Sequence, residues 1–266
     1  MRLKECFTRV TNLTSILIIA CLTQLILPGS PIQAGPQNGE QNILVQLELG
    51  PVWQTRNDVQ IPNNQDGTRF SLVDLVGSGP FPAGRLYLTW HIARRHDLRL
   101  LLAPLSYNQT GTFNEPVSFA GQTFTPDQSI DGNYKFNSWR LTYRYKFHDG
   151  TQWHWWIGFT AKIRDARIKL VQGSVSSEKT DLGFVPLLHL QGRVDLNDRW
   201  WLRLDIDALA GGPGRAEDAA LQVGFNFSDT WAIASGYRTV EGGADVEEVY
   251  NFAWLHFFTV SVEYGF

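Results

Sequence analysis

Apolar and polar side chains alternate with a period of two along most of this chain. In the last segment one face carries Phe252, Trp254, Phe258, Val260, Val262, Tyr264 and Phe266. A period of two is that of a β-strand, whose successive side chains point to opposite faces. After residue 34 the chain has no apolar run long enough to cross a bilayer as a helix. We therefore expect an all-β protein.

The alternating pattern recurs in ten segments. They are residues 43–53, 84–94, 97–107, 136–147, 153–164, 182–196, 200–209, 219–227, 230–240 and 252–266. The links between them alternate in length, with long ones at 54–83, 108–135, 165–181, 210–218 and 241–249. Alternating short turns and long loops are typical of membrane-spanning barrels. The sequence predicts a single antiparallel transmembrane β-barrel of about ten strands, with an extra strand or short helix within residues 69–76.

The side chains on the two faces indicate which face meets lipid. Charged residues share the face opposite the apolar one, whereas a soluble barrel has an apolar interior. Trp153, Trp200 and Trp231 fall at one set of strand ends, and Trp53 and Trp254 fall near the other. Aromatic residues at both ends are typical of the two interfaces of a membrane. We therefore expect a lipid bilayer around the barrel and a polar interior.

The first 34 residues have the layout of a secretory signal peptide. Arg2, Lys4 and Arg9 precede an apolar stretch, and small residues follow it up to Ala34. We expect cleavage there and a mature domain of residues 35–266; lipidation of Cys21 is a less favoured alternative. The segment holds three of the 23 basic and one of the 26 acidic residues, which leaves 20 against 25 and a net charge of −5. This charge argues against nucleic acid as a partner.

Charged residues of the polar face are expected to meet inside a narrow ten-stranded lumen. The expected charge network consists of Glu48, Arg140, Arg144, Lys162, Arg164, Arg193, Arg203, Asp205 and Asp207. A turn at residues 197–199 places Arg193 opposite Arg203, Gln191 opposite Asp205 and His189 opposite Asp207. Asp205 is then the expected partner of both arginines. We interpret the set as a network of ion pairs that largely closes the lumen.

The closing segment, residues 260–266, resembles the C-terminal signal of bacterial outer-membrane proteins. It alternates apolar residues and ends on Tyr264 and Phe266. The resemblance implies the bacterial outer membrane as location and the barrel assembly machinery as a partner. It covers the last strand only and implies no activity.

Two functions remain open from the sequence. The favoured one is a structural or small-solute, porin-like barrel; the alternative is an outer-membrane hydrolase or lipid-modifying enzyme. The weak catalytic candidates are His189, Asp205 and Asp207, which loosely resemble the acidic residues and His-Asp pair of ten-stranded outer-membrane proteases. His91, His154 and His256 each stand alone in a strand, and His256 falls on the apolar face. No metal or cofactor motif is visible, and no feature defines an oligomeric state, a solute or a substrate.

The acidic residues near the last two long links have two interpretations. The segment 242–248, together with Glu217 and Asp218, forms either a hydrated surface or a mouth that attracts cations. We favour the hydrated surface, because exposed acidic loops usually do no more than keep a surface soluble.

Overall fold

The computed structural model describes residues 42–212 and 214–266. The expected signal peptide, with Cys6 and Cys21, lies outside these residues. No helix in the described ranges is long and apolar enough to cross a membrane.

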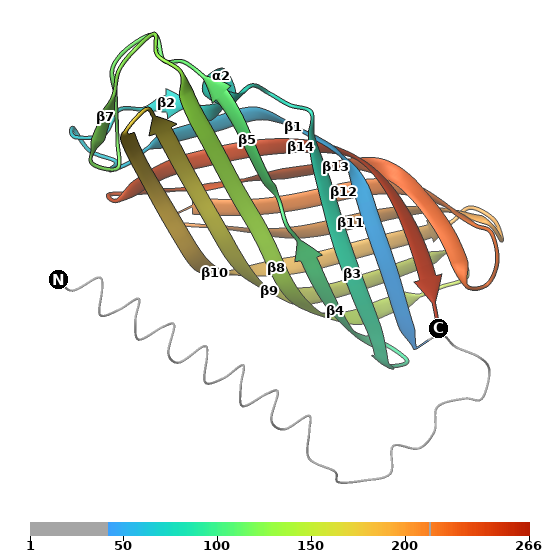
Figure 1. Ribbon diagram of the computed structural model, residues 1–266. Coiled ribbons are helices and arrows are strands. Elements are labelled where there is room, and N and C mark those ends of the chain that lie inside the picture. The colour runs from blue at the N-terminus through green and yellow to red at the C-terminus, as the bar shows by residue number, and fades with distance from the viewer. Residues whose placement is uncertain (1–41, 213) are drawn as a thin grey trace. The chain divides into compact units, whose positions relative to one another are not determined.

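The described chain forms a closed antiparallel β-barrel (Figure 1). Strands that follow each other in the chain pair around the wall, except that β4 and β5 both pair with β8, and the last strand pairs with the first. The wall strands are β1 (Ile43–Gln60), β3 (Phe81–Ala93), β4 (His96–Ala103), β5 (Ser106–Gly111), β8 (Ile130–Asp149), β9 (Trp153–Gln172), β10 (Val175–Asp195), β11 (Trp200–Gly211), β12 (Gly214–Asn226), β13 (Trp231–Val246) and β14 (Val249–Gly265). Because β4 and β5 follow each other along β8, they occupy one position in the wall. The barrel therefore has ten strands, which confirms the predicted fold class.

The outward face of the wall is apolar. Leu47, Ile157, Phe159 and Leu221 lie on it with 45–57% of their surface exposed. A large continuous apolar surface is unfavourable in water and matches the hydrocarbon of a bilayer. Trp153, Trp200 and Trp231 are exposed at the end that carries the short turns and the terminal strand ends, which we call the turn end.

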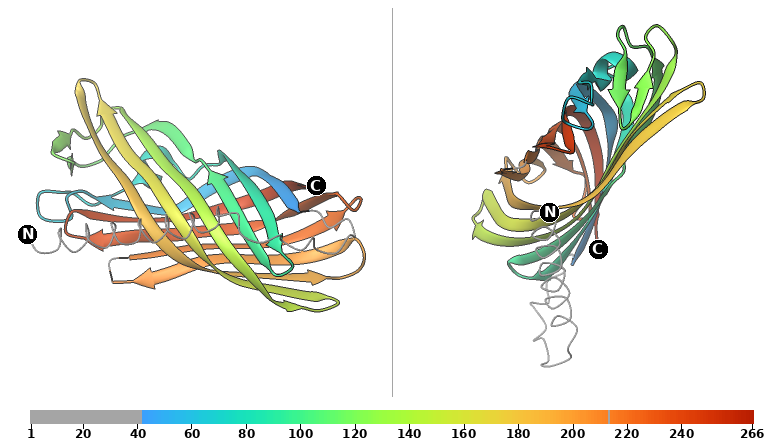
Figure 2. Two further views of the ribbon diagram at one scale, coloured as in Figure 1. Left: turned by 90° about the horizontal axis from the view of Figure 1, so that it is seen from below. Right: turned by 90° about the vertical axis from the view of Figure 1, so that its left-hand side faces the viewer.

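Three of the expected long loops are instead mostly strand, so that the predicted boundaries 165–181, 210–218 and 241–249 are wrong. β9 and β10 continue to a tight turn between Gln172 and Val175, and β13 and β14 meet between Val246 and Val249. The hydrophobic alternation stops where the wall leaves the apolar layer, but backbone pairing continues beyond it. The β9–β10 hairpin extends past the neighbouring β11 and β12, as Figure 2 shows, and β10 first pairs with β11 at Leu188.

The two remaining loops pack together at the opposite end and form what we call the cap. The first loop contains β2 (Phe70–Ser71) and α2 (Leu72–Val76), so residues 69–76 include both a short strand and a helix. The Ser71 hydroxyl accepts a hydrogen bond from the Asp74 amide at 3.2 Å and caps this helix. The second loop contains β6 (Val117–Phe119) and β7 (Gln122–Phe124), which pair as a small hairpin.

The cap is held by apolar packing against inward-facing wall residues. Its core includes Phe70, Leu72, Leu75, Val76, Phe113, Val117, Phe119 and Phe124 from the loops, and Val52, Val59, Tyr107, Ile130, Tyr134 and Leu170 from the wall. Gly111 and Gly132 provide room for α2, because a Cβ at Gly111 would lie 1.8 Å from the Leu75 carbonyl oxygen. The upper interior is thus filled by chain that is not part of the wall.

Candidate functional site: the charged interior

The interior between the cap and the turn end is filled by charged side chains from the wall. Alternate residues of each strand point inward, so that β11 contributes Arg203, Asp205 and Asp207, and β8 contributes Arg140 and Arg144. In the described ranges, six arginines and six carboxylates are buried. This lumen network consists of Arg85, Arg99, Arg140, Arg144, Arg203 and Arg238 with Glu48, Asp97, Asp205, Asp207, Asp218 and Glu263.

Asp218 is the centre of the network near the cap. Its carboxylate accepts hydrogen bonds from Arg85 at 2.8 Å, Arg140 at 2.6 Å and Arg238 at 2.5 Å. These partners come from β3, β8 and β13, while Asp218 lies on β12. Arg238 also donates to Glu48 on β1 at 3.0 Å. The contacts therefore cross the lumen and tie together strands that are not neighbours in the wall.

A second group of ion pairs lies further from the cap. Arg99 holds Asp205 through two hydrogen bonds, of 2.5 and 3.2 Å. Arg144 donates to Asp97 at 2.9 Å and to Gln191 at 2.6 Å. Such paired and hydrogen-bonded charges offset the cost of removing them from water, whereas a single unpaired member leaves an uncompensated buried charge.

The structure brings most of the expected residues together. Glu48, Arg140, Arg144, Arg203, Asp205 and Asp207 lie in the lumen network, and Lys162 is buried beside it. Arg164 and Arg193 do not join it: Arg164 pairs with Asp181, and Arg193 pairs with Asp195 at 2.8 Å, with more than a quarter of each arginine side chain exposed. Both arginines stay partly exposed, and each pairs with a carboxylate whose side chain is itself 30% or more exposed.

The expected cross-strand neighbours are present, but their ion pairs differ. Arg193 faces Arg203, Gln191 faces Asp205, and His189 faces Asp207. Asp205, however, binds Arg99 across the lumen, and Arg203 donates to Glu263 at 2.6 Å. The expectation that Asp205 serves Arg193 and Arg203 is wrong, because long arginine side chains reach across the barrel.

Several members of the network were missed from the sequence. Asp218 was assigned to an exposed acidic loop, but it is 2% exposed inside the barrel. The signal was the spacing of two that links it to Ala220 and Gln222 on the inward face of β12. Arg238 also follows this spacing, on the inward face of β13, while Asp97 and Arg99 lie in segment 97–107, which contains Pro104.

His189 and Asp207 form a hydrogen bond inside the barrel. The His189 Nδ1 atom lies 2.8 Å from Asp207 Oδ1, and the same carboxylate accepts from Thr160 and Arg140. The His189 side chain has no exposed surface, and its Nε2 atom makes no hydrogen bond to any described residue. The geometry of a general base is present, but a substrate has no path to it in this structure.

The three histidines singled out from the sequence besides His189 lie on three different strands, His91 on β3, His154 on β9 and His256 on β14. His91 contacts Asp97 at 2.7 Å, and His154 contacts Asp149 and Asp195 at 2.8 and 3.1 Å. His256 stays on the outward face, between Thr55 at 2.8 Å and Tyr237 at 2.5 Å. The irregularity in pairing is on the facing strand β1, between Gln54 and Arg56, and it presents Thr55 to His256.

Comparison with known proteins defines the fold but not a family. No protein-family model matches the sequence, and no curated protein matches it. The outer-membrane protease OmpT from Escherichia coli is similar in structure, with a TM-score of 0.52, 9% identity, and coverage of 86% of this chain and 99% of that one. The translocator domain of the autotransporter NalP from Neisseria meningitidis covers 98% of each chain with a TM-score of 0.43 and 11% identity. The COG4313 outer-membrane channel from Pseudomonas putida F1 covers 90% of this chain and 100% of that one, with a TM-score of 0.40 and 11% identity.

The closed wall, the apolar outer face and the polar interior define the class of this protein. It has the fold of the bacterial outer-membrane β-barrels. Likeness at this level of identity carries the fold alone, and the activity of the outer-membrane protease is not assigned to this chain.

Proposed function

We propose that the protein is a bacterial outer-membrane barrel that is closed along its axis and acts as a structural scaffold for its cap. One observation carries this proposal: ion pairs from opposite parts of the wall, centred on Asp218, fill the lumen below an apolar cap. An open pore keeps water between its charged walls, whereas these side chains contact one another directly. The cap end then faces the outside of the cell and the turn end the periplasm.

Export and assembly belong to the same proposal. Residues 1–34 direct the chain out of the cytoplasm, and Tyr264 and Phe266 at the turn end are read by the barrel assembly machinery. The two rings lie 4.8 Å apart, and Tyr264 also contacts Trp231 at 4.5 Å. The position of these aromatic side chains at one rim of the barrel supports their role as a terminal signal.

The test is electrical conductance in planar lipid bilayers. We expect the refolded parent barrel to give no steady current at neutral pH. The Asp218→Asn variant, which removes the anion that three arginines share, is expected to give intermittent openings, because the centre of the network is then lost. Steady single-channel conductance by the parent would contradict the proposal and favour a small-solute channel.

The enzyme alternative is tested by His189→Ala in the same preparation. The buried His189–Asp207 contact is interpreted here as part of the packing of the lumen. We expect the parent to hydrolyse neither peptides nor lipids, and His189→Ala to differ from it in stability alone. Hydrolysis of a peptide or lipid by the parent that disappears in His189→Ala would reverse this interpretation.

A further inference from the structure

The barrel wall has an interruption between β3 and β5. β3 pairs with β4 from Ala93 up to Leu86, which faces Leu102. After β4 the chain leaves β3 at Pro104, and the strand that follows, β5, pairs only with β8. The remaining part of β3, from Phe81 to Arg85, pairs only with β1. Among the described residues, therefore, no ladder joins the upper halves of β3 and β5.

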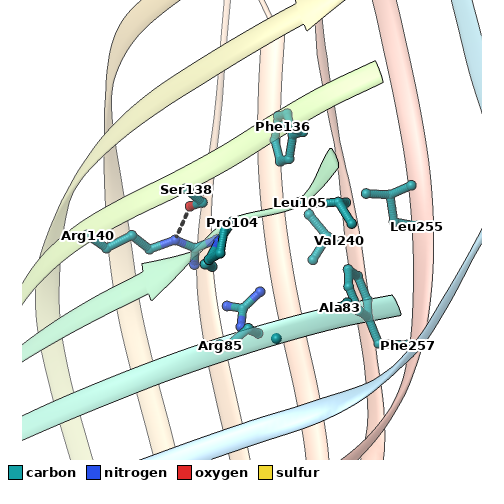
Figure 3. Close-up of a pocket in the computed structure, with 12 residues that line it drawn as sticks. Ala83, Arg85, Pro104, Leu105, Phe136, Ser138, Arg140, Val240, Leu255 and Phe257 are labelled. Carbon is teal, nitrogen blue, oxygen red and sulfur yellow. Dashed lines mark hydrogen bonds between the residues drawn. The ribbon is translucent and has the colours of Figure 1, made fainter. Parts of the chain in front are cut away.

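A cavity lies directly behind this interruption. Its volume is about 20 Å³, which is room for a water molecule. Gly84 and Pro104 line it at the wall, where Gly84 has no side chain and Pro104 has no amide hydrogen to donate across the gap. Figure 3 shows Pro104 among the side chains that line the cavity.

The lining of the cavity is apolar on one side and basic on the other. Leu105, Phe136, Leu255 and Phe257 form the side toward the cap. Arg85 and Arg140 lie on the side toward the lumen network, as Figure 3 shows. The cavity therefore lies between the apolar core of the cap and the charged lumen network, next to the hydrocarbon that surrounds the wall.

Lys162 is the one buried cation of the described interior that the lumen network leaves without a carboxylate. The six buried arginines are matched by six buried carboxylates, and Lys162 is a seventh cation. Its side chain is buried, with a relative exposure of 4%, and its ammonium lies 5.0 Å from the centre of the Phe136 ring. On the adjacent strand it faces Arg140, so that two lining residues of the cavity flank it. A buried ammonium without an anion favours the entry of a negatively charged group.

We propose that the interruption at Pro104 is a lateral portal, through which a single-chain carboxylic acid enters from the bilayer and places its carboxylate beside Lys162. The chemistry of the site selects this ligand. Its carboxylate supplies the missing negative charge, and its acyl chain lies along the apolar lining and leaves through the wall into hydrocarbon. Because the edges of β3 and β5 are not hydrogen-bonded to each other, they can separate without breaking a ladder. Their separation makes the room for the acyl chain that the closed cavity of about 20 Å³ lacks. The proposal does not require the lumen to be closed along its axis.

The test is binding of palmitate to the whole refolded barrel in a nonionic detergent. Palmitate with a photoreactive diazirine near its carboxyl end is expected to label residues that line the cavity, among them Leu105 and Phe136. Unlabelled palmitate should compete with the probe. Two controls should compete at least tenfold more weakly: hexadecanol, which has the same chain without the charge, and acetate, which has the charge without the chain. Labelling spread evenly around the outer wall, or equal competition by hexadecanol, would overturn the proposal.

Two pairs of variants separate the portal from general effects on the barrel. Lys162→Met should weaken palmitate binding about tenfold or more and leave the barrel folded, because it removes an uncompensated buried charge. Lys169→Met, further along the same strand, is the matched control and should bind as the parent does. Leu105→Trp should block the cavity, whereas Leu102→Trp, on the outward face nearby, should not. Heat-modifiable migration on a gel verifies folding, and parental affinity in folded Lys162→Met would refute the proposed role of Lys162.

Discussion

The two halves of the barrel interior are filled in different ways. Toward the turn end the filling consists of charged side chains that belong to the wall itself, and each is held by partners on other strands. Toward the cap end it consists of two loops that bring their own apolar side chains, such as Phe119 and Leu72, against inward-facing wall residues. The first filling connects the strands to one another, while the second packs loop residues against a wall that closes through the pairing of β14 with β1. Removing a member of each should therefore have different consequences.

Asp218→Asn should produce the largest loss of global stability. The substitution leaves three buried arginines without their shared anion, and breaking buried ion pairs costs on the order of 3 to 5 kcal/mol. Urea unfolding in detergent measures the change. Glu217→Gln, on the exposed face of the same strand, is the control. Equal midpoints for the two variants would mean that water already hydrates the network.

Phe119→Ala should have a large effect that is confined to the cap. Phe119 is fully buried and its ring lies 5.8 Å from that of Phe70, so its truncation is expected to cost about 3 kcal/mol. Because the wall does not depend on this contact, we expect faster proteolysis within residues 112–129 and an unchanged heat-modifiable barrel. Phe227→Ala, at an exposed position, should alter neither property. Loss of the folded barrel in Phe119→Ala would show that cap and wall form one cooperative unit.

Arg203→Leu should destabilise the barrel less than Asp218→Asn does. One pair with Glu263 and the bonds to Gln222 are lost, and a hydrogen bond to a charged group contributes about 1.5 to 3 kcal/mol. Arg56→Leu should cost under about 1 kcal/mol, since Arg56 and its partner Asp58 are both substantially exposed. The two urea midpoints, measured in the same detergent, give the comparison. A larger effect for Arg56 would contradict the assignment of the network as the more stabilising region.

The two glycines beneath α2 should respond differently to alanine. At Gly111 the new Cβ meets the backbone oxygen of Leu75 at 1.8 Å, whereas at Gly132 its closest contact is Val76 Cγ1 at 2.6 Å, the end of a side chain that can move. We expect Gly111→Ala to displace the helix and to cost about 1 to 3 kcal/mol of cap stability, and Gly132→Ala to cost less. Hydrogen exchange of residues 70–77 reports the difference. Equal protection of α2 in both variants would contradict this prediction, because the backbone contact at Gly111 would then cost no more than the side-chain contact at Gly132.

The sequence predicts the two regions unequally. The period of two defines which wall residues face inward. Together with the position of the turn at residues 197–199, it correctly predicts the cross-strand neighbours of Asp205 and Asp207. It does not define which charges meet across the lumen, because that depends on barrel closure and on the reach of arginine side chains, as with Arg99 and Asp205. The cap has no repeating pattern, and its apolar side chains pack against inward-facing wall residues that are distant in the sequence. Strand lengths were underestimated for a related reason, since pairing continues where the apolar face ends.

The most direct test of the account is the conductance of a barrel without the second loop of its cap. Replacement of residues 113–128 by a short Gly-Ser linker removes the β6–β7 hairpin and leaves the lumen network unchanged. If the network by itself closes the lumen, this variant should give no steady current in a planar bilayer and should conduct only when Asp218→Asn is added. A steady current through the variant with an intact network would contradict the account, because closure would then depend on the cap alone.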